Sequence, residues 1–189
     1  MRSARQTQAL TGERSRQSRC HGDRSHCLTS LSALLLPSLS FEVALTQKGA
    51  CFDYAQFHFD HYSRAHTWSF DSGVVVPATA APAFHGDPER VDPEEAFVAS
   101  LSSCHMLTFL AIAARKRFIV EQYRDEALGV LSKNEHGKLW MSHVSLRPKV
   151  VFSGEKRPAD TEIAAMHHSA HENCFIALSV RSEVTVEPQ

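Results

Sequence analysis

The sequence has little net charge, no even number of cysteines and no internal repeat, and the first two features exclude classes of function. Twenty Lys and Arg residues oppose 21 Asp and Glu residues in the 189-residue chain, which gives a formal net charge of −1. Nucleic-acid-binding domains carry a basic excess, so this balance argues against a nucleic-acid partner. We also expect no apolar run long enough to span a bilayer, and therefore no membrane partner.

The cysteines are few and odd in number. Five of them are spread along the chain, at Cys20, Cys27, Cys51, Cys104 and Cys174. Secreted disulfide frameworks are small domains that use an even number of closely spaced cysteines. We therefore expect reduced thiols and a cytoplasmic location.

Residues 1–52 differ from the rest, and we expect them to lie outside a folded domain at 53–189. The first 30 residues hold six arginines and only two acids, with many Ser, Thr and Gln. Such a segment cannot bury a core and is expected to be disordered. A transit peptide, a secretory signal and an extension outside the folded unit are the alternatives, and we favour the extension. A transit peptide would change the expected location to an organelle.

The stretch from Asp92 to Arg117 predicts one long helix. Asp92 can cap its N-terminus, Pro93 fits the first turn, and Glu95 completes a capping box. The acids at its start and the three basic residues at its end match the helix dipole. Residues 96–114 are apolar almost all the way round, so we expect a buried helix.

Alternating patterns on both sides of this helix predict strands. We expect strands at 56–62, 67–70, 74–76, 122–132, 138–152 and 180–186, and a second helix at 159–173. Pro148 indicates an edge position or a bulge in its strand. Strands grouped in hairpins, with two helices packed on them, make an α+β domain.

Two cysteines lie on the predicted helices. Cys104 is in the middle of the long helix and Cys174 closes the second one. A free cysteine is often only a small core residue, but a reactive thiol needs a positive charge nearby to ionise. Glu94 lies ten residues before Cys104, close to three turns, and can orient an arginine on the same face. Arg64 and Arg90 are the candidates.

The second helix also carries three histidines. His167, His171 and Cys174 have spacings that place them on one face, and His168 lies beside them. Such a set suits zinc or copper, although helix histidines are also commonly solvated. The alternative function is therefore a non-enzymatic thiol or metal-binding module.

The string DPEEAFVASLSSCHM at residues 92–106, followed by AHENCFIALSV at 170–180, resembles the OsmC/Ohr family of hydroperoxide-reducing thiol proteins. The resemblance covers about residues 55–188. It implies an OsmC-like fold, with antiparallel sheets packed on a long central helix and a second helix. It also implies a tightly intertwined homodimer with two active sites at the subunit interface, without cofactor or metal.

The resemblance implies roles for individual residues. Cys104 matches the peroxidatic cysteine, Cys174 the resolving cysteine, and Glu94 the acid that holds a catalytic arginine, for which Arg64 is the best candidate. The expected function is a peroxiredoxin-like, antioxidant reduction of organic hydroperoxides through a Cys104 sulfenic acid and a Cys104–Cys174 disulfide, with a dithiol reductant such as a lipoyl protein. Phe175 replaces the proline typical of strongly active members, which indicates an OsmC-like subgroup. We expect an apolar substrate mouth lined by Phe97, Met106, Phe109 and Phe175.

Overall fold

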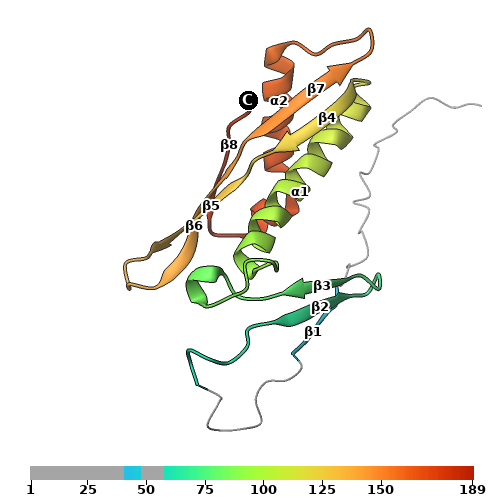
Figure 1. Ribbon diagram of the computed structural model, residues 1–189. Helices are drawn as coiled ribbons and strands as arrows, with labels where there is room; N and C mark the ends of the chain where they lie inside the picture. The colour runs from blue at the N-terminus through green and yellow to red at the C-terminus, as the bar shows by residue number, and fades with distance from the viewer. Residues whose placement is uncertain (1–40, 48–57) are drawn as a thin grey trace, which may run out of the picture. The chain divides into compact units, whose positions relative to one another are not determined.

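Helix α1, Pro93–Arg115, is the longest element of the computed structural model, which describes residues 41–47 and 58–189 (Figure 1). Its N-terminus forms as predicted. The Asp92 carboxylate accepts a hydrogen bond from the Glu95 N–H at 2.8 Å, and the Glu95 carboxylate accepts one from the Asp92 N–H at 3.4 Å. The capping box is therefore confirmed, with Pro93 in the first turn where its missing N–H costs nothing.

One stripe of α1 is buried in the described chain. It consists of Leu101, His105, Phe109 and Ala113, each one turn after the last. Leu107, outside this stripe, is 61% exposed. Within a single chain, the burial predicted for this helix is therefore confined to one stripe.

The length and composition of α1 also correct the expectation about apolar runs. Its mean hydropathy of 1.7 over a membrane-length window makes it long and apolar enough to cross a bilayer. The core helix of a soluble protein passes the same test, so the match is weak evidence for a membrane span.

Three strands form an antiparallel sheet before α1. The sheet has the order β1-β2-β3, with β1 at Val43–Thr46, β2 at His66–Phe70 and β3 at Val75–Ala78. The predicted hairpin between β2 and β3 is confirmed, and Gly73 supplies the left-handed φ of 83° that its turn requires. Strand β1 lies within the range expected as the 1–52 extension, so the described sheet begins before residue 53.

The strand predicted at 56–62 is wrong over the part that the structure describes. Residues 58–62 form a turn in which the N–H groups of His61 and Tyr62 both donate to the His58 carbonyl, at 2.9 and 3.0 Å. Alternating aromatic residues are typical of a strand, whereas two consecutive hydrogen bonds to one carbonyl require a tight reversal of the chain. The rest of the predicted strand, and the predictions for residues 1–40 and 48–55, lie outside the described residues.

Four strands follow α1 where two long ones were predicted. They are β4 at Ile119–Asp125, β5 at Leu128–Lys133, β6 at Leu139–Leu146 and β7 at Pro148–Ser153. β4 pairs with β7 and β5 pairs with β6, both antiparallel, so each predicted strand is divided between two sheets. Pro148 has no N–H to donate, which fits its position at the start of β7 rather than inside a strand.

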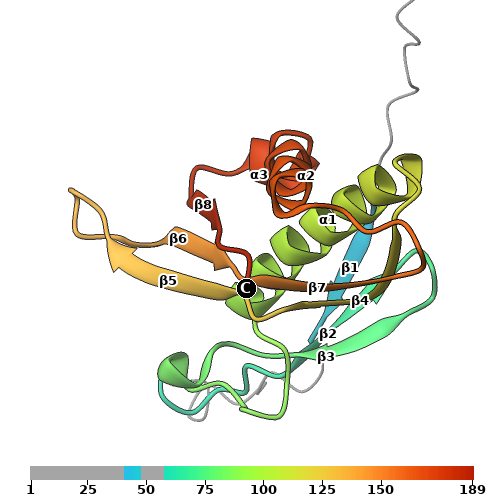
Figure 2. The ribbon, with the colours of Figure 1, turned by 90° about the horizontal axis from the view of Figure 1, so that it is seen from above.

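Two helices and a last strand complete the chain. Helix α2, Asp160–Glu172, confirms the second predicted helix, and it is followed by the short helix α3, Phe175–Ser179, which was not predicted. Strand β8, Glu183–Val186, runs parallel to β6 in the sheet β5-β6-β8. Helices α2 and α3 lie along one side of α1, with β4 and β7 on another (Figure 2).

The two halves of α1 pack into different clusters. Its C-terminal half joins α2 and β7 in a core of Phe109, Ala113, Phe118, Phe152, Met166 and Ala170. Its N-terminal half joins β6 in a core of Leu101, Val144 and Leu146, with apolar residues of β8 packed against it. Cys104 lies between these two halves.

Candidate functional site

Cys104 and Cys174 lie next to each other where α1 meets α3. Both are free thiols; Cys104 is partly exposed, whereas Cys174 is 1% exposed. Burial, together with the neighbouring Cys104 thiol, raises the pKa of Cys174 to about 11. Cys174 is therefore a protonated thiol at neutral pH, held against a more accessible partner.

The chain turn after α2 positions Cys174. The Cys174 N–H donates to the carbonyl of His171 at 3.2 Å as α2 ends, and the Cys174 sulfur accepts a hydrogen bond from the Ala177 N–H at 3.5 Å. Cys174 thus caps α3 as well as following α2. Sequence reasoning missed α3, for which the short apolar run at residues 175–178 was the available signal.

The candidate arginines have other partners in this chain. Arg64 donates to the carbonyl groups of Tyr62, at 2.6 Å, and Phe59, and its guanidinium lies 3.9 Å from the centre of the Tyr62 ring. Arg90 forms an ion pair with Asp87 at 3.1 Å. The described part of one chain therefore contains no ion pair between either arginine and the acid predicted to hold it.

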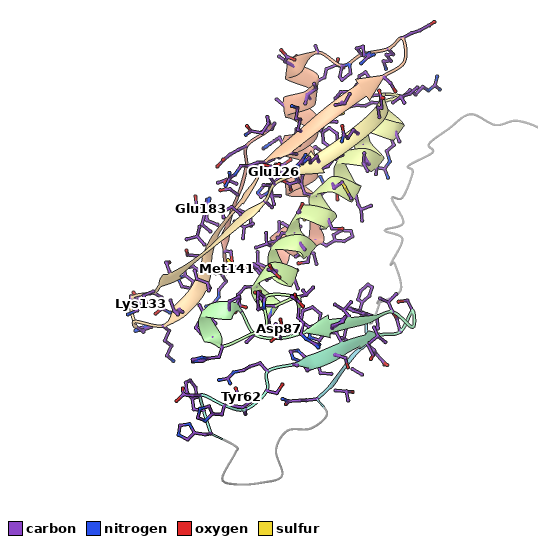
Figure 3. The ribbon with its side chains drawn as sticks, in the orientation of Figure 1. Tyr62, Asp87, Glu126, Lys133, Met141 and Glu183 are labelled. Carbon is purple, nitrogen blue, oxygen red and sulfur yellow. The ribbon has the colours of Figure 1, made fainter. Side chains whose placement is uncertain are left out.

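Glu94 lines a cavity of about 650 Å³ beside the N-terminal half of α1. Three more acids line it, Asp92, Glu95 and Asp125, together with apolar side chains that include Met141 on β6 (Figure 3). The Glu94 carboxylate has no ion pair or hydrogen bond in the described ranges 41–47 and 58–189. The roles of Glu94 and Arg64 remain predictions.

The four side chains expected to form an apolar mouth do not share one cavity. Phe109 is fully buried in the core, and Phe97 packs against the cluster around Leu101. Met106 lines the 650 Å³ cavity, whereas Phe175 is 78% exposed beside another one. That prediction is wrong because these positions fall on different faces of α1 and on α3.

A second cavity, of about 410 Å³, follows the face of α1 that carries Cys104. Four of its lining residues come three, four, seven and eleven positions after Cys104, and such spacings place them on one helical face. They are Leu107, Thr108, Ala111 and Arg115. Asn173 and Phe175, on either side of Cys174, line it from the other side. A cavity lined by four apolar and four polar or charged residues, with Arg115 as its cation, thus follows the helical face that carries Cys104.

Two histidines form a buried pair next to this site. His105 Nε2 lies 3.1 Å from His167 Nδ1, and both rings are almost fully buried. Burial is the main cause that lowers the pKa of each to about 4. Sequence reasoning missed this pair, which joins residues 62 positions apart.

The histidines of α2 do not form a metal cluster in the structure. His167 faces His105, whereas His168 is exposed and pairs with Glu172 at 3.4 Å. Across the described ranges, no three His, Cys, Asp or Glu residues gather closely enough to hold a metal ion. The alternative function as a metal-binding module thus has no ligand set in the part of the chain that the structure describes.

The family model for OsmC-like proteins matches residues 86–189, more than half of the chain. The chain belongs to the OsmC family. The matched segment contains α1, α2, Glu94 and both thiols, whereas Arg64 lies before it. No curated protein matches this OsmC protein in sequence.

Solved structures of OsmC proteins share the fold. An OsmC-like protein of unknown function from Vibrio cholerae is 48% identical, with a TM-score of 0.74, over 80% of this chain and 100% of that one. An organic hydroperoxide resistance protein of Bacillus subtilis is 18% identical, with a TM-score of 0.57, over 80% and 98%. Another, from Legionella pneumophila, is 17% identical, with a TM-score of 0.57, over 81% and 97%. The predicted α+β, OsmC-like fold is confirmed.

Proposed function

We propose that this OsmC protein is a thiol-dependent peroxidase that reduces organic hydroperoxides to alcohols. The contact between a partly exposed Cys104 and a buried, protonated Cys174 carries the proposal. Such a pair can accept two electrons as a disulfide without a cofactor. Membership of the OsmC family and the fold shared with organic hydroperoxide resistance proteins support the substrate class.

Cys104 is the attacking thiol in this scheme because it is the more accessible of the two. Its thiolate attacks the terminal peroxide oxygen, the O–O bond breaks, and the alkoxide takes a proton and leaves as the alcohol. Cys104 is oxidised to a sulfenic acid. The burial of Cys174 keeps peroxide from that thiol and leaves the Cys104 sulfur as its reaction partner.

Cys174 then resolves the intermediate. Its thiol loses a proton and attacks the Cys104 sulfur; the S–O bond breaks and water leaves. The resulting Cys104–Cys174 disulfide is reduced by a dithiol, which becomes a disulfide itself. A lipoyl group on a partner protein is the dithiol that the family resemblance suggests.

The 410 Å³ cavity supplies space for the organic part of the substrate. It continues along the Cys104 face of α1, and four of its eight lining residues are apolar, namely Leu107, Ala111, Ile112 and Phe175. Burial of an alkyl or aryl group there would place the peroxide at the thiol and favour organic hydroperoxides over hydrogen peroxide.

A second copy of the chain completes the site in our proposal, which includes a cytoplasmic homodimer. Apolar side chains are exposed on α1 and on the N-terminal sheet, among them Leu45, Val75 and Leu107. Arg64 would meet Glu94 across the interface, stabilise the Cys104 thiolate and interact with the leaving oxygen.

Turnover with cumene hydroperoxide and hydrogen peroxide, with dihydrolipoamide as the reductant, tests the function. We expect faster turnover with the organic peroxide. Peptide mass spectrometry after one equivalent of peroxide should find a Cys104–Cys174 disulfide that dihydrolipoamide removes. Full turnover in a Cys104→Ser protein would contradict the proposal.

A further inference from the structure

Three cationic side chains meet at a cavity that shares no residue with the two cavities described above. Arg124 comes from β4, Lys149 from β7, and Arg147 from the position between β6 and β7. The cavity has a volume of about 330 Å³, and Glu126 and Gln189 complete its lining. Three cations against one acidic side chain make it a basic cavity.

The strand register places two of these cations directly opposite each other. Arg124 and Lys149 are paired residues of the β4–β7 ladder. Like charges at such positions destabilise a sheet. Glu126 offsets part of this repulsion, because it forms an exposed ion pair with Arg124 at 2.8 Å. Lys149 has no ion pair within the ranges that the structure describes.

Arg147 adds an unused hydrogen-bond donor. Its backbone N–H donates to the Asp125 carboxylate at 2.7 Å, which fixes the backbone beside the cavity. Its side-chain Nε–H is buried and has no acceptor in the described chain. A buried donor without a partner costs free energy, so this guanidinium is held where an external acceptor would stabilise it.

We propose that this cavity binds a phosphate group. A guanidinium fork matches the oxygens of a phosphate, and a lysine supplies a further point charge. The bound anion would accept from the Arg147 guanidinium and neutralise the facing Arg124 and Lys149. A cavity of this volume is at the small end of ligand pockets, which suits a phosphate with little organic structure attached.

The first test is the binding of inorganic phosphate to the full chain, measured by calorimetry and by thermal unfolding against chloride at equal ionic strength. We expect one phosphate per chain and a melting temperature that rises with phosphate. Lys149→Gln should weaken binding by roughly tenfold or more, because it removes one of three charges. The same variant should melt at a higher temperature without phosphate, since the repulsion opposite Arg124 is gone.

Lys133→Gln is the matched control. Lys133 is an exposed lysine at the far end of β5, whereas Glu126 marks the junction of β4 and β5 beside the basic cavity (Figure 3). We expect phosphate binding to be unchanged in Lys133→Gln. Arg147→Lys should bind more weakly than the parent chain, because it keeps the charge but loses the fork.

Two further probes distinguish a soluble phosphate ester from a lipid headgroup as the ligand. Glycerol phosphate represents a soluble ester, and vesicles with phosphatidic acid, compared with phosphatidylcholine alone, represent a lipid headgroup. Binding of either that requires Lys149 supports the phosphate site and identifies its source. Absence of binding to all three probes, or equal losses in Lys149→Gln and Lys133→Gln, would overturn the proposal.

Discussion

Acid should destabilise this OsmC protein through the two histidines buried between α1 and α2. Burial is the first cause that lowers the pKa of both His105 and His167 from 6.5 to about 4. The neighbouring His167 and His171 lower the pKa of His105 further, and the negative charge of Asp125 partly opposes this. Neither ring is protonated at neutral pH.

The sign of the effect follows from proton linkage. A base whose pKa is lower in the folded state binds fewer protons there than in the unfolded chain. Its contribution to stability is therefore complete above pH 6.5 and is lost as the pH falls toward 4. A pKa difference of this size corresponds to about 3 kcal/mol for one histidine, against a total stability of roughly 5–15 kcal/mol for a domain.

Urea titrations measure the effect as the free energy of unfolding at each pH, from about pH 7 to about pH 4. The proteins compared are the parent chain, His167→Asn and His168→Asn. His167→Asn should lose stability near neutral pH, because His105 loses its partner, but its stability should fall less steeply with acid. His168→Asn is the matched control, one residue away on the exposed side of α2, and it should keep the steep fall. Equal pH dependence in the three proteins would refute the reasoning.

Three further predictions concern the thiol site and α1. Cys104→Ser should abolish turnover, whereas Cys174→Ser should still form one dimedone-reactive sulfenic acid per chain; a fully active Cys104→Ser would contradict this. Arg64→Ala should raise the pH at which iodoacetamide alkylates Cys104, and Glu94→Gln should do so less; an unmoved profile in Arg64→Ala would exclude that arginine. Asp92→Ala should lower the free energy of unfolding by about 1 kcal/mol in urea titrations, because α1 loses its cap, and an unchanged value would count against that role.

Local signals explain what the sequence predicted correctly about the fold. The start of α1 was predictable because Asp92, Pro93 and Glu95 specify a helix N-terminus through contacts within one turn. The buried face of α2 was predictable from the spacing of Met166 and Ala170. The division of two long strands into four was not predictable. Alternation within a segment predicts an extended chain, but it does not indicate which strand each half pairs with.

The candidate site was only partly predictable for the same reason. Cys104 and Cys174 were paired through a family resemblance, and the structure brings them together. The contact between His105 and His167 left no local trace, because its members are 62 positions apart. Arg64 and Glu94 form no ion pair in the described part of one chain, and in our proposal a second copy brings them together.

Because only one stripe of α1 is buried within a single chain, the stability of the folded chain depends on dimer formation in our proposal. Apolar residues such as Leu107 on its other faces are exposed in one chain, and in our proposal a second copy covers them. Burying that surface then contributes to stability only after two chains meet, so the melting temperature rises with protein concentration. Dilution would act on this protein as a mild denaturant, and refolding would include a step whose rate depends on the encounter of two chains.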